Sequence, residues 1–304
     1  MIQLYTTQFH DNKDFIDKFM KRDNLKKEQY QSSEYTSLLR VQQREIEFHD
    51  RWANDSRAED VLVHQSFESL LAPENRMIID LMGNIRGKRV LDIAAGLGES
   101  AVYFALQGAN VTAVDISPEM ITHVNKLAHL HGVDVATSVC PIETLNLPDE
   151  QFDYCYAANV LHHVVDKKSA LREISRVLKP NGVVFTWDPL AYNPIINIYR
   201  RIATEVRTPD EKPVTFGYIN EFKEVFTDVD YRVFWFTSLI IFIKYFLVDR
   251  VHPNTDRYWK RILQEKPSTM IWMRPLLALD RTLLRIPLLR YLAWSIVVHG
   301  HKAS

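Results

Sequence analysis

The sequence predicts an α/β fold in which a mainly parallel sheet has helices on both faces. Val90 to Ile93 is a short apolar run, followed by a turn of small residues, Ala94 to Gly98, and an expected helix from Glu99 to Leu106. A second apolar run, 109–115, ends in Asp115, about 20 residues after the turn. Short apolar runs that alternate with helices are typical of a parallel sheet that is buried on both faces.

The turn suits the close approach of a ligand to the backbone. Small residues leave the backbone amides accessible, and the N-terminus of the following helix adds partial positive charge. An acid at this spacing is expected to bind ribose hydroxyls. The turn has the pattern Ala94-x-Gly96-x-Gly98 and lacks the third glycine of a dinucleotide site. An NAD-dependent oxidoreductase is therefore disfavoured but stays an alternative.

Val90–Gly98 together with Val114–Met120 resembles the class I S-adenosylmethionine (SAM)-dependent methyltransferases, close to the small-molecule enzymes of ubiquinone and menaquinone biosynthesis. The likeness covers residues 70–190, where five motifs follow one another in the family's order. This resemblance implies a Rossmann-like, seven-stranded, mainly parallel sheet and SAM as the cofactor.

The resemblance also implies which residues hold SAM. The glycine turn would seat the methionine portion with support from Asp92, Asp115 would hold the ribose, and Ile116 would lie beside the adenine. Many family members have Asp-Ala-Glu after the third strand, where this sequence has Pro141-Ile142-Glu143, so the backbone of Ile142 is expected at the adenine edge. Glu143 either replaces the usual side-chain contact or is solvated. The expected cofactor-binding set is Asp92, Ala94, Gly96, Gly98, Asp115, Ile116, Ile142, Glu143 and Asn159.

Candidate catalytic residues follow the fourth and fifth strands. The run after Phe152 brings Asn159, His162 and His163 to the edge of the sheet where ligands bind. A histidine there could accept a proton from a hydroxyl or amine, because its ordinary pKa lies near neutrality; the alternative is a structural histidine. Tyr192 is expected to contact the substrate or to belong to an ordinary turn. Adjacent histidines without a third ligand at helical spacing are a poor zinc or iron signature, so no metal site is predicted.

Composition limits the function classes. The chain has 304 residues, 46% of them apolar, and a net charge of −1, which argues against nucleic acid as the main partner. Only two cysteines are present, which favours a reducing cytoplasm, and the N-terminus is too polar for a signal peptide.

Four parts are expected along the chain. These are an N-terminal helical arm or lid (1–70), a SAM-binding core (71–236), an apolar helical insertion (237–290), and the last strand with the C-terminus (291–304). Apolar faces of the arm are predicted at Phe15 to Met20 and at Leu38 to Trp52. Other helices are expected over 73–82, 167–178, 195–208 and 220–226, and strands over 133–139, 183–187, 229–236 and 292–298.

The insertion is unusually apolar, with arginines interleaved along its second half. Its apolar run is shorter than the roughly 20 residues that a spanning helix needs. Three interpretations stay open: contact with a membrane surface, a cap over the substrate, or a homodimer interface.

The sequence therefore predicts transfer of the sulfonium methyl of SAM to oxygen, nitrogen or carbon of a small-molecule acceptor, and a hydrophobic acceptor is one open choice. Positioning and exclusion of water would supply most of the catalysis. Two alternatives share the cofactor motifs: an enzyme that cyclises or cleaves SAM, and a SAM-binding protein without chemistry.

Overall fold

The computed structural model describes residues 32–304, with side chains from residue 37 onward. The chain divides into two compact units, residues 1–43 and residues 44–304. Helix α2 (Ser32–Asn54) begins in the first unit and ends in the second. The predicted apolar face from Phe15 to Met20 lies outside the described residues.

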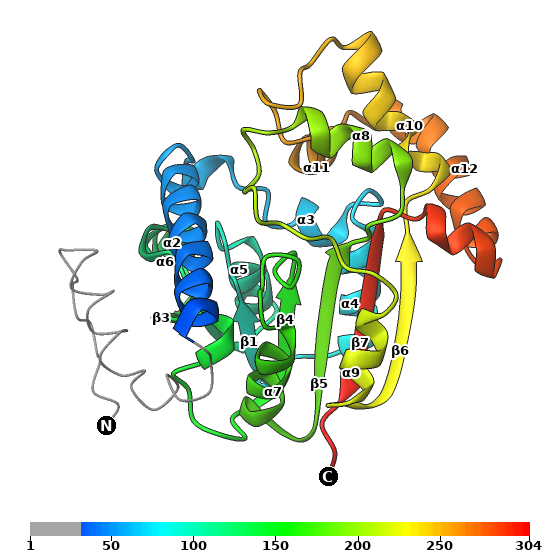
Figure 1. The fold of residues 1–304 in the computed structure, drawn as a ribbon. Coiled ribbons are helices and arrows are strands. Elements are labelled where there is room, and N and C mark those ends of the chain that lie inside the picture. Colours follow the sequence, from blue (N-terminus) through cyan, green and yellow to red (C-terminus); the bar gives the residue numbers. More distant parts are fainter. Residues whose placement is uncertain (1–31) are drawn as a thin grey trace. The chain divides into compact units, whose positions relative to one another are not determined.

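A seven-stranded sheet forms the centre of the second unit, in the order β3-β2-β1-β4-β5-β7-β6 (Figure 1). The strands from β3 to β5 pair in parallel, whereas β7 runs antiparallel to β5 and β6. The predicted Rossmann-like, mainly parallel sheet is confirmed. Its strands are β1 (Arg89–Ile93), β2 (Asn110–Asp115), β3 (Val135–Val139), β4 (Phe152–Ala158), β5 (Leu178–Pro189), β6 (Thr227–Phe234) and β7 (Ser295–His301).

Helices cover both faces of this sheet, as expected. Alternate residues of β1 enter two separate cores, Val90 on one face and Leu91 on the other. The first core includes buried residues of α4 (Pro73–Met82), α5 (Glu99–Leu106) and α6 (Pro118–His131). The second includes residues of α7 (Lys167–Val177) and α9 (Tyr218–Lys223).

Local sequence sets the ends of the helices that support the site. Ser117 caps α6, because its side-chain oxygen accepts a hydrogen bond from the amide of Met120, and Pro118 occupies the first turn. Gly83 ends α4 with a positive φ of 61°. These signals are short-range, and α4 begins and ends as the sequence predicts.

The helix after β5 is shorter than predicted. Helix α8 (Pro194–Ile202) stops six residues before the expected end at Thr208. Thr208 precedes Pro209, and a proline disfavours helical geometry at the residue before it. The segment after α8 instead contributes Arg207 and Glu211 to an ion pair.

Several strands also begin elsewhere than predicted, and the largest shifts are at β5 and β7. Strand β5 starts at Leu178 rather than 183, because Leu178 pairs with Phe152 before a shift in register. Strand β7 starts at Ser295 rather than 292, because a 3-10 helix occupies Pro287–Leu292.

The segment between β6 and β7 is helical, as predicted. Its elements are the 3-10 helix η4 (Thr237–Leu239), α10 (Ile240–Ile243), the π-helix η5 (Lys244–Val248), α11 (Tyr258–Arg261), the 3-10 helix η6 (Ile262–Gln264), α12 (Pro267–Leu283) and the 3-10 helix η7 (Pro287–Leu292). Asp280 of α12 accepts hydrogen bonds from the amides of Phe236 and Thr237, which fixes α12 against the end of β6. Among the described residues, no helix combines the length and apolarity needed to cross a membrane.

Candidate functional site

The turn between β1 and α5 is built from left-handed residues. Ala94, Gly96 and Gly98 have φ values of 56°, 54° and 92°. A Cβ atom on Gly98 would lie 3.0 Å from the Cα atom of Val124 in α6. Gly98 therefore permits close packing between α5 and α6, the task that a third glycine performs in a dinucleotide site.

Asp92 presents one carboxylate oxygen without a partner beneath this turn. The hydroxyl of Ser100 donates to Oδ2 at 2.6 Å, whereas Oδ1 is buried and accepts no hydrogen bond. Burial raises the pKa of Asp92 to about 7. A buried carboxylate with an orphaned oxygen is a good partner for an ammonium group.

Asp115, at the end of β2, holds the turn in place. Its two carboxylate oxygens accept hydrogen bonds from the amides of Gly96 at 3.0 Å and Ser117 at 2.9 Å. Burial raises the pKa of Asp115, and the nearby charge of His49 opposes that effect. Each carboxylate oxygen has a second lone pair that remains for ribose hydroxyls.

The expected adenine contacts lie at the neighbouring strand ends. Ile116, directly after β2, is half-buried, and Ile142 and Glu143 are buried in the 3-10 helix η3 (Ile142–Thr144) after β3. The amide of Cys140 donates to the carbonyl oxygen of Asp115 at 3.0 Å, which ties the two strand ends together.

The turn after β4 separates the roles of the two histidines. Asn159 has a φ of 58°, and its amide donates to the carbonyl of Trp187 at 2.7 Å. The His162 ring is buried with Nδ1 2.8 Å from the Asp188 carboxylate. Burial lowers the pKa of His162 well below its ordinary value and raises the pKa of Asp188 to about 7. His162 is therefore held inside the fold.

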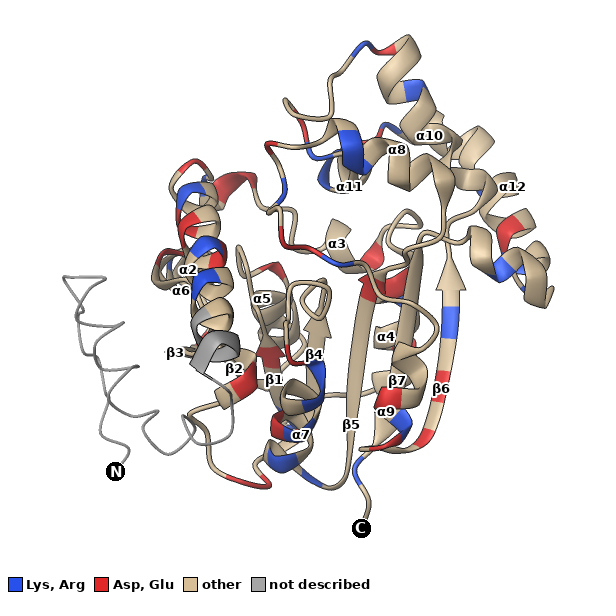
Figure 2. Cartoon of the chain, viewed as in Figure 1, with Lys and Arg blue, Asp and Glu red and all other residues tan. Residues whose placement is uncertain are grey.

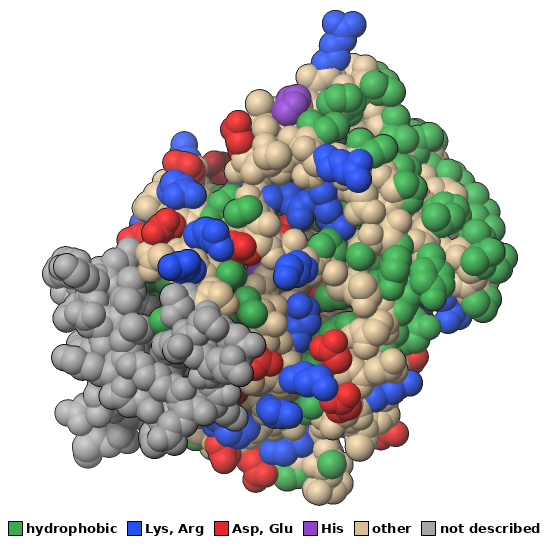
Figure 3. All heavy atoms as spheres, viewed as in Figure 1, with side chains coloured by type: hydrophobic (Ala, Val, Ile, Leu, Met, Phe, Trp, Pro, Cys, Tyr) green, Lys and Arg blue, Asp and Glu red, His purple; other side chains and the backbone are tan. Residues whose placement is uncertain are grey.

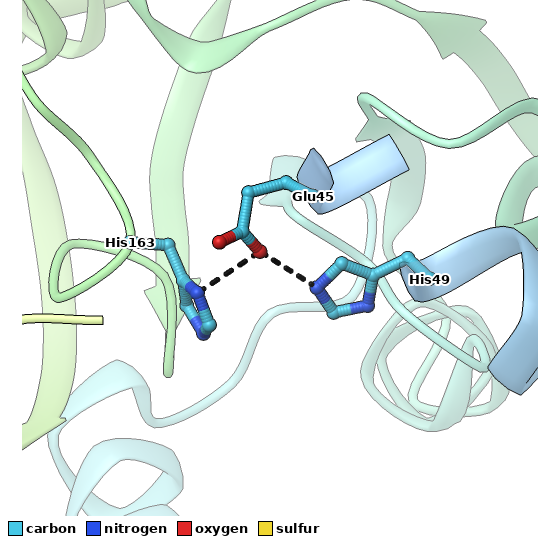
Figure 4. Close-up of side chains that lie close together, drawn as sticks. All are labelled: Glu45, His49 and His163. Carbon is cyan, nitrogen blue, oxygen red and sulfur yellow. Dashed lines mark ion pairs between the residues drawn. The ribbon is translucent and has the colours of Figure 1, made fainter. Parts of the chain in front are cut away.

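His163 faces helix α2 instead. Its Nδ1 lies 3.1 Å from Oε2 of Glu45, and Nε2 of His49 lies 3.5 Å from the same oxygen (Figure 4). Oε1 of Glu45 accepts a hydrogen bond of 2.5 Å from the Thr208 hydroxyl, and Nε2 of His163 lies 3.8 Å from Glu211. Burial lowers the pKa of His163, but the contact with Glu45 outweighs it, and the net shift is upward.

Glu45 and His49 were not predicted as site residues. They lie four positions apart on one face of α2, a spacing visible in the sequence. The same spacing of a histidine and a glutamate occurs at the exposed pair His64 and Glu68, so it does not by itself indicate a site.

Tyr192 lies in a different cluster from the histidines. Its ring stacks on Phe216 with centroids 5.5 Å apart and meets Tyr291 edge-on at 5.0 Å. Its hydroxyl oxygen accepts a hydrogen bond from the amide of Phe216, so its proton remains available to a ligand. A catalytic role for Tyr192 stays a prediction.

The end of α2 also contacts residues beside the glycine turn and Asp115, where the cofactor is expected. The Ser117 hydroxyl donates to Asp50 at 2.5 Å, and Ala53 packs with Leu97 and Met120. The guanidinium of Arg257 lies 4.2 Å from the ring centroid of Trp52.

The insertion reaches the same place. Lys260 of α11 pairs with Glu99 at the start of α5, and Trp259 meets Trp52 edge-on at 5.8 Å. The glycine turn therefore has neighbours from both the arm and the insertion.

These residues fit SAM. The orphaned oxygen of Asp92 suits the ammonium group of the methionine portion, the left-handed turn exposes backbone amides, and Asp115 retains lone pairs for a ribose. The assignment of individual residues to parts of SAM stays a prediction.

Residues 91–186 match the family model described as a methyltransferase domain. The demethylmenaquinone methyltransferase of Renibacterium salmoninarum is 28% identical over 171 residues, which cover 54% of this chain and 70% of that one. The ubiquinone biosynthesis O-methyltransferase of Pseudomonas syringae pv. tomato is 34% identical over 131 residues, covering 42% of this chain and 55% of that one. The match thus spans little more than half of the second relative.

Solved structures share the fold. The YcgJ protein from Bacillus subtilis aligns with a TM-score of 0.51 and 20% identity, over 75% of this chain and 97% of that one. A putative sarcosine dimethylglycine methyltransferase from Galdieria sulphuraria has a TM-score of 0.51 and 18% identity, over 75% and 83%. Residues 91–186 are therefore a methyltransferase domain, and the chain is similar to class I SAM-dependent methyltransferases of the small-molecule type.

Proposed function

We propose that this enzyme methylates an oxygen, nitrogen or carbon atom of a small hydrophobic acceptor. One observation carries the proposal: His163 follows β4, which is the sheet neighbour of β1, and β1 carries the orphaned oxygen of Asp92. An acceptor-facing histidine and a cofactor-facing carboxylate at adjacent strand ends support a site for two substrates.

Each predicted residue receives a role in this proposal. Asp92 and the turn residues Ala94, Gly96 and Gly98 hold the methionine portion, and Asp115 holds the ribose. Ile116, Ile142 and Glu143 border the adenine, while Asn159 borders the methionine end. His163 with Glu45 accepts the proton that leaves the acceptor, and His162 positions the turn after β4 through its contact with Asp188. Tyr192 donates its hydroxyl proton to a remote part of the acceptor.

SAM supplies an electrophilic methyl group on a positively charged sulfur. The acceptor's nucleophilic atom forms a bond to the methyl carbon as the sulfur–carbon bond breaks, and its proton leaves. The products are the methylated acceptor, neutral S-adenosylhomocysteine and a proton. The residues of this chain align the acceptor and exclude water, and His163 with Glu45 draws the proton away.

An exposed apolar surface on the insertion supports a hydrophobic acceptor. Leu247 and Val248 are 65% and 72% exposed, and Ile271 and Leu288 are each 77% exposed. Hydrophobic side chains gather over α10 and α12 in Figure 3. The other exposed apolar residues of this surface are Ile240, Ile243, Phe246, Leu279, Ile286 and Tyr291.

We propose that this apolar surface of the insertion binds an anionic membrane. Arg250, which follows η5, and Arg274 and Arg281 of α12 are exposed, and Figure 2 shows basic residues in this part of the chain. Apolar burial combined with basic flanks is the composition of an interfacial membrane contact. In this proposal the enzyme is cytoplasmic and binds the membrane peripherally, where a lipid-like acceptor resides.

Vesicle sedimentation tests the membrane contact. The double substitution Leu247→Asp and Val248→Asp should release the protein from vesicles of phosphatidylglycerol and phosphatidylcholine. Leu130→Asp is the control, because Leu130 is 52% exposed on α6. Binding that survives the double substitution would contradict the assignment, as would a dimer that only this substitution dissociates.

The by-product tests the chemistry. Incubation of the protein with SAM and short-chain quinol or phenol acceptors should yield S-adenosylhomocysteine in an acceptor-dependent manner. Methylthioadenosine would instead indicate an enzyme that cyclises or cleaves SAM. Tight binding of SAM with no product across acceptors would favour a protein without chemistry.

A further inference from the structure

The contact between α2 and the turn after β4 joins two histidines and a carboxylate. Glu45 Oε2, His49 Nε2 and His163 Nδ1 come together there (Figure 4). One ligand atom from each of these residues lies within 4.8 Å of the other two. Two histidines and one carboxylate are a common ligand set for zinc and for non-haem iron.

We propose that Glu45, His49 and His163 bind one divalent transition-metal ion. The proposal rests on the proposed function, because the ion would draw the proton from the acceptor that His163 and Glu45 face. This metal site is separate from the proposed SAM site at the glycine turn.

The distances between the ligand atoms suit one ion. Ligand atoms bound at about 2.0–2.2 Å to a tetrahedral or octahedral ion lie about 3–3.6 Å apart. Oε2 of Glu45 is 3.1 Å from Nδ1 of His163 and 3.5 Å from Nε2 of His49. Both separations fall within that range, and the two histidine nitrogens lie within 4.8 Å of each other.

The directions of these atoms support the same conclusion. Oε2 of Glu45 is buried and accepts no hydrogen bond of good geometry, despite the short distance to His163. Nδ1 of His163 instead has hydrogen-bond geometry toward the Thr208 hydroxyl at 3.4 Å. A buried carboxylate oxygen without a well-directed donor can bind a metal ion beside the two ring nitrogens.

The surroundings of the three side chains complete a metal site. The Thr208 hydroxyl fixes the other oxygen of Glu45, and Glu211 faces the second ring nitrogen of His163 at 3.8 Å. A carboxylate behind a ligating histidine orients the ring and raises its basicity. Glu211 is itself paired with Arg207, so it is held in position.

Three protein ligands leave coordination positions open. An oxygen or nitrogen of the acceptor can occupy one of them, and its proton becomes more acidic there. The proton is then released to solvent as the bond to the methyl carbon forms and the sulfur–carbon bond breaks, while His163 and Glu45 stay bound to the ion. Neither the metal nor any residue changes its oxidation state, so no further reactant is needed.

The chain provides a matched control for this cluster. His64 and Glu68 are also a histidine and a glutamate four residues apart, with His64 Nδ1 3.1 Å from Glu68 Oε1. Both side chains are more than half exposed, and neither belongs to a group of three possible ligands among the described residues. Spacing alone therefore predicts equal metal binding at the two pairs, whereas the proposal predicts binding only at Glu45, His49 and His163.

Metal binding by the full-length protein tests the proposal. After treatment with a chelator, the protein is titrated with Zn²⁺ by calorimetry and with Co²⁺ by visible absorption spectroscopy. The expected result is one ion per chain for the wild type and for His64→Ala. Glu45→Gln, His49→Ala and His163→Ala should each lose the Co²⁺ spectrum, and Thr208→Val should weaken binding about 10- to 100-fold.

S-adenosylhomocysteine binding separates failure of this inference from failure of the proposed function. The metal-free protein, Glu45→Gln and His163→Ala should bind it like the wild type, which also shows that they are folded; His49→Ala is left out of this comparison because the charge of His49 acts on Asp115. Absence of Zn²⁺ and Co²⁺ binding by the wild type would overturn the metal site and leave Glu45 and His163 as an ion pair, with methyl transfer intact. Metal binding that persists in all three ligand variants, or that disappears in His64→Ala, would also overturn the metal site.

Discussion

The site has a cofactor half, formed by Asp92, the glycine turn and Asp115, and an acceptor half, formed by His163 and Glu45. The two halves are assembled over very different sequence distances. The hydrogen bond that closes the cofactor turn joins Gly96 to Asp115, which are 19 positions apart. The hydrogen bond that fixes Glu45 comes from Thr208, 163 positions away. The cofactor half therefore depends on one β-α-β unit, whereas the acceptor half requires α2, the turn after β4 and the segment after α8 to pack together.

This difference predicts that the two halves can be disabled separately. The largest effect is expected for His163→Ala, which should lower kcat by about 10²- to 10⁴-fold, the usual contribution of proton transfer. The affinity for S-adenosylhomocysteine should stay unchanged, because no cofactor-half residue depends on His163. Steady-state kinetics beside calorimetry check this prediction, with His64→Ala as the control. A matching loss of cofactor affinity would show that the two halves are not independent.

The same difference explains what the sequence predicted. The turn, Asp115, and the cap of α6 all depend on neighbours within one unit, and local patterns identified them. Glu45 was missed because nothing near it in the sequence indicates His163. Tyr192 was expected to contact the substrate or to belong to an ordinary turn; it lies in an aromatic cluster with Phe216 and Tyr291, from two distant segments.

The length of α8 has a similar cause. Helical periodicity favours continuation beyond Ile202, and no local signal before Thr208 opposes it strongly. The Thr208 hydroxyl instead contacts Glu45, and the amide of Glu205 donates to Asn254, so distant segments hold the chain after α8. Long-range contacts therefore determine this boundary as they determine the acceptor half.

Gly98→Ala tests how closely the cofactor half is packed. The substitution should lower the free energy of unfolding by about 1–2 kcal/mol through backbone strain, and by a further ~1–3 kcal/mol because the new methyl group meets Val124. Gly132→Ala is the matched control, since its φ is 65° but nothing lies within 4 Å of the added atom. Denaturant unfolding of both variants isolates the packing contribution. Equal losses would remove the close approach of α5 and α6 from the explanation.

Asp115→Ala should produce the converse of the His163 result. Loss of a hydrogen-bonded carboxylate should weaken binding of S-adenosylhomocysteine by about 1–3 kcal/mol. At saturating SAM, kcat should stay close to the wild-type value, because Asp115 is not expected to touch the acceptor. Calorimetry and kinetics at high SAM concentration measure the two quantities. Unchanged affinity would contradict the ribose assignment.

The smallest effect is expected from the protonation of Asp92. Its pKa is raised to about 7, chiefly by burial, and the nearby Glu99 and Asp115 carboxylates act in the same direction, while the Ser100 hydroxyl opposes them. Below that pH the carboxyl group is neutral and attracts an ammonium group weakly; above it, the carboxylate attracts it strongly. Affinity for S-adenosylhomocysteine should therefore rise with pH up to about 7, by at most about tenfold per pH unit, and then level off.

Calorimetry at several pH values measures that dependence, and buffers of different ionisation enthalpy reveal whether binding releases a proton near neutrality. Asp92→Asn should bind more weakly at pH 8 and lose the rise, because its amide does not titrate. His163→Ala should keep the rise, since His163 belongs to the acceptor half. A pH dependence that vanished in His163→Ala and persisted in Asp92→Asn would reverse the assignment of the two halves and place the ammonium group of the cofactor beside the histidines.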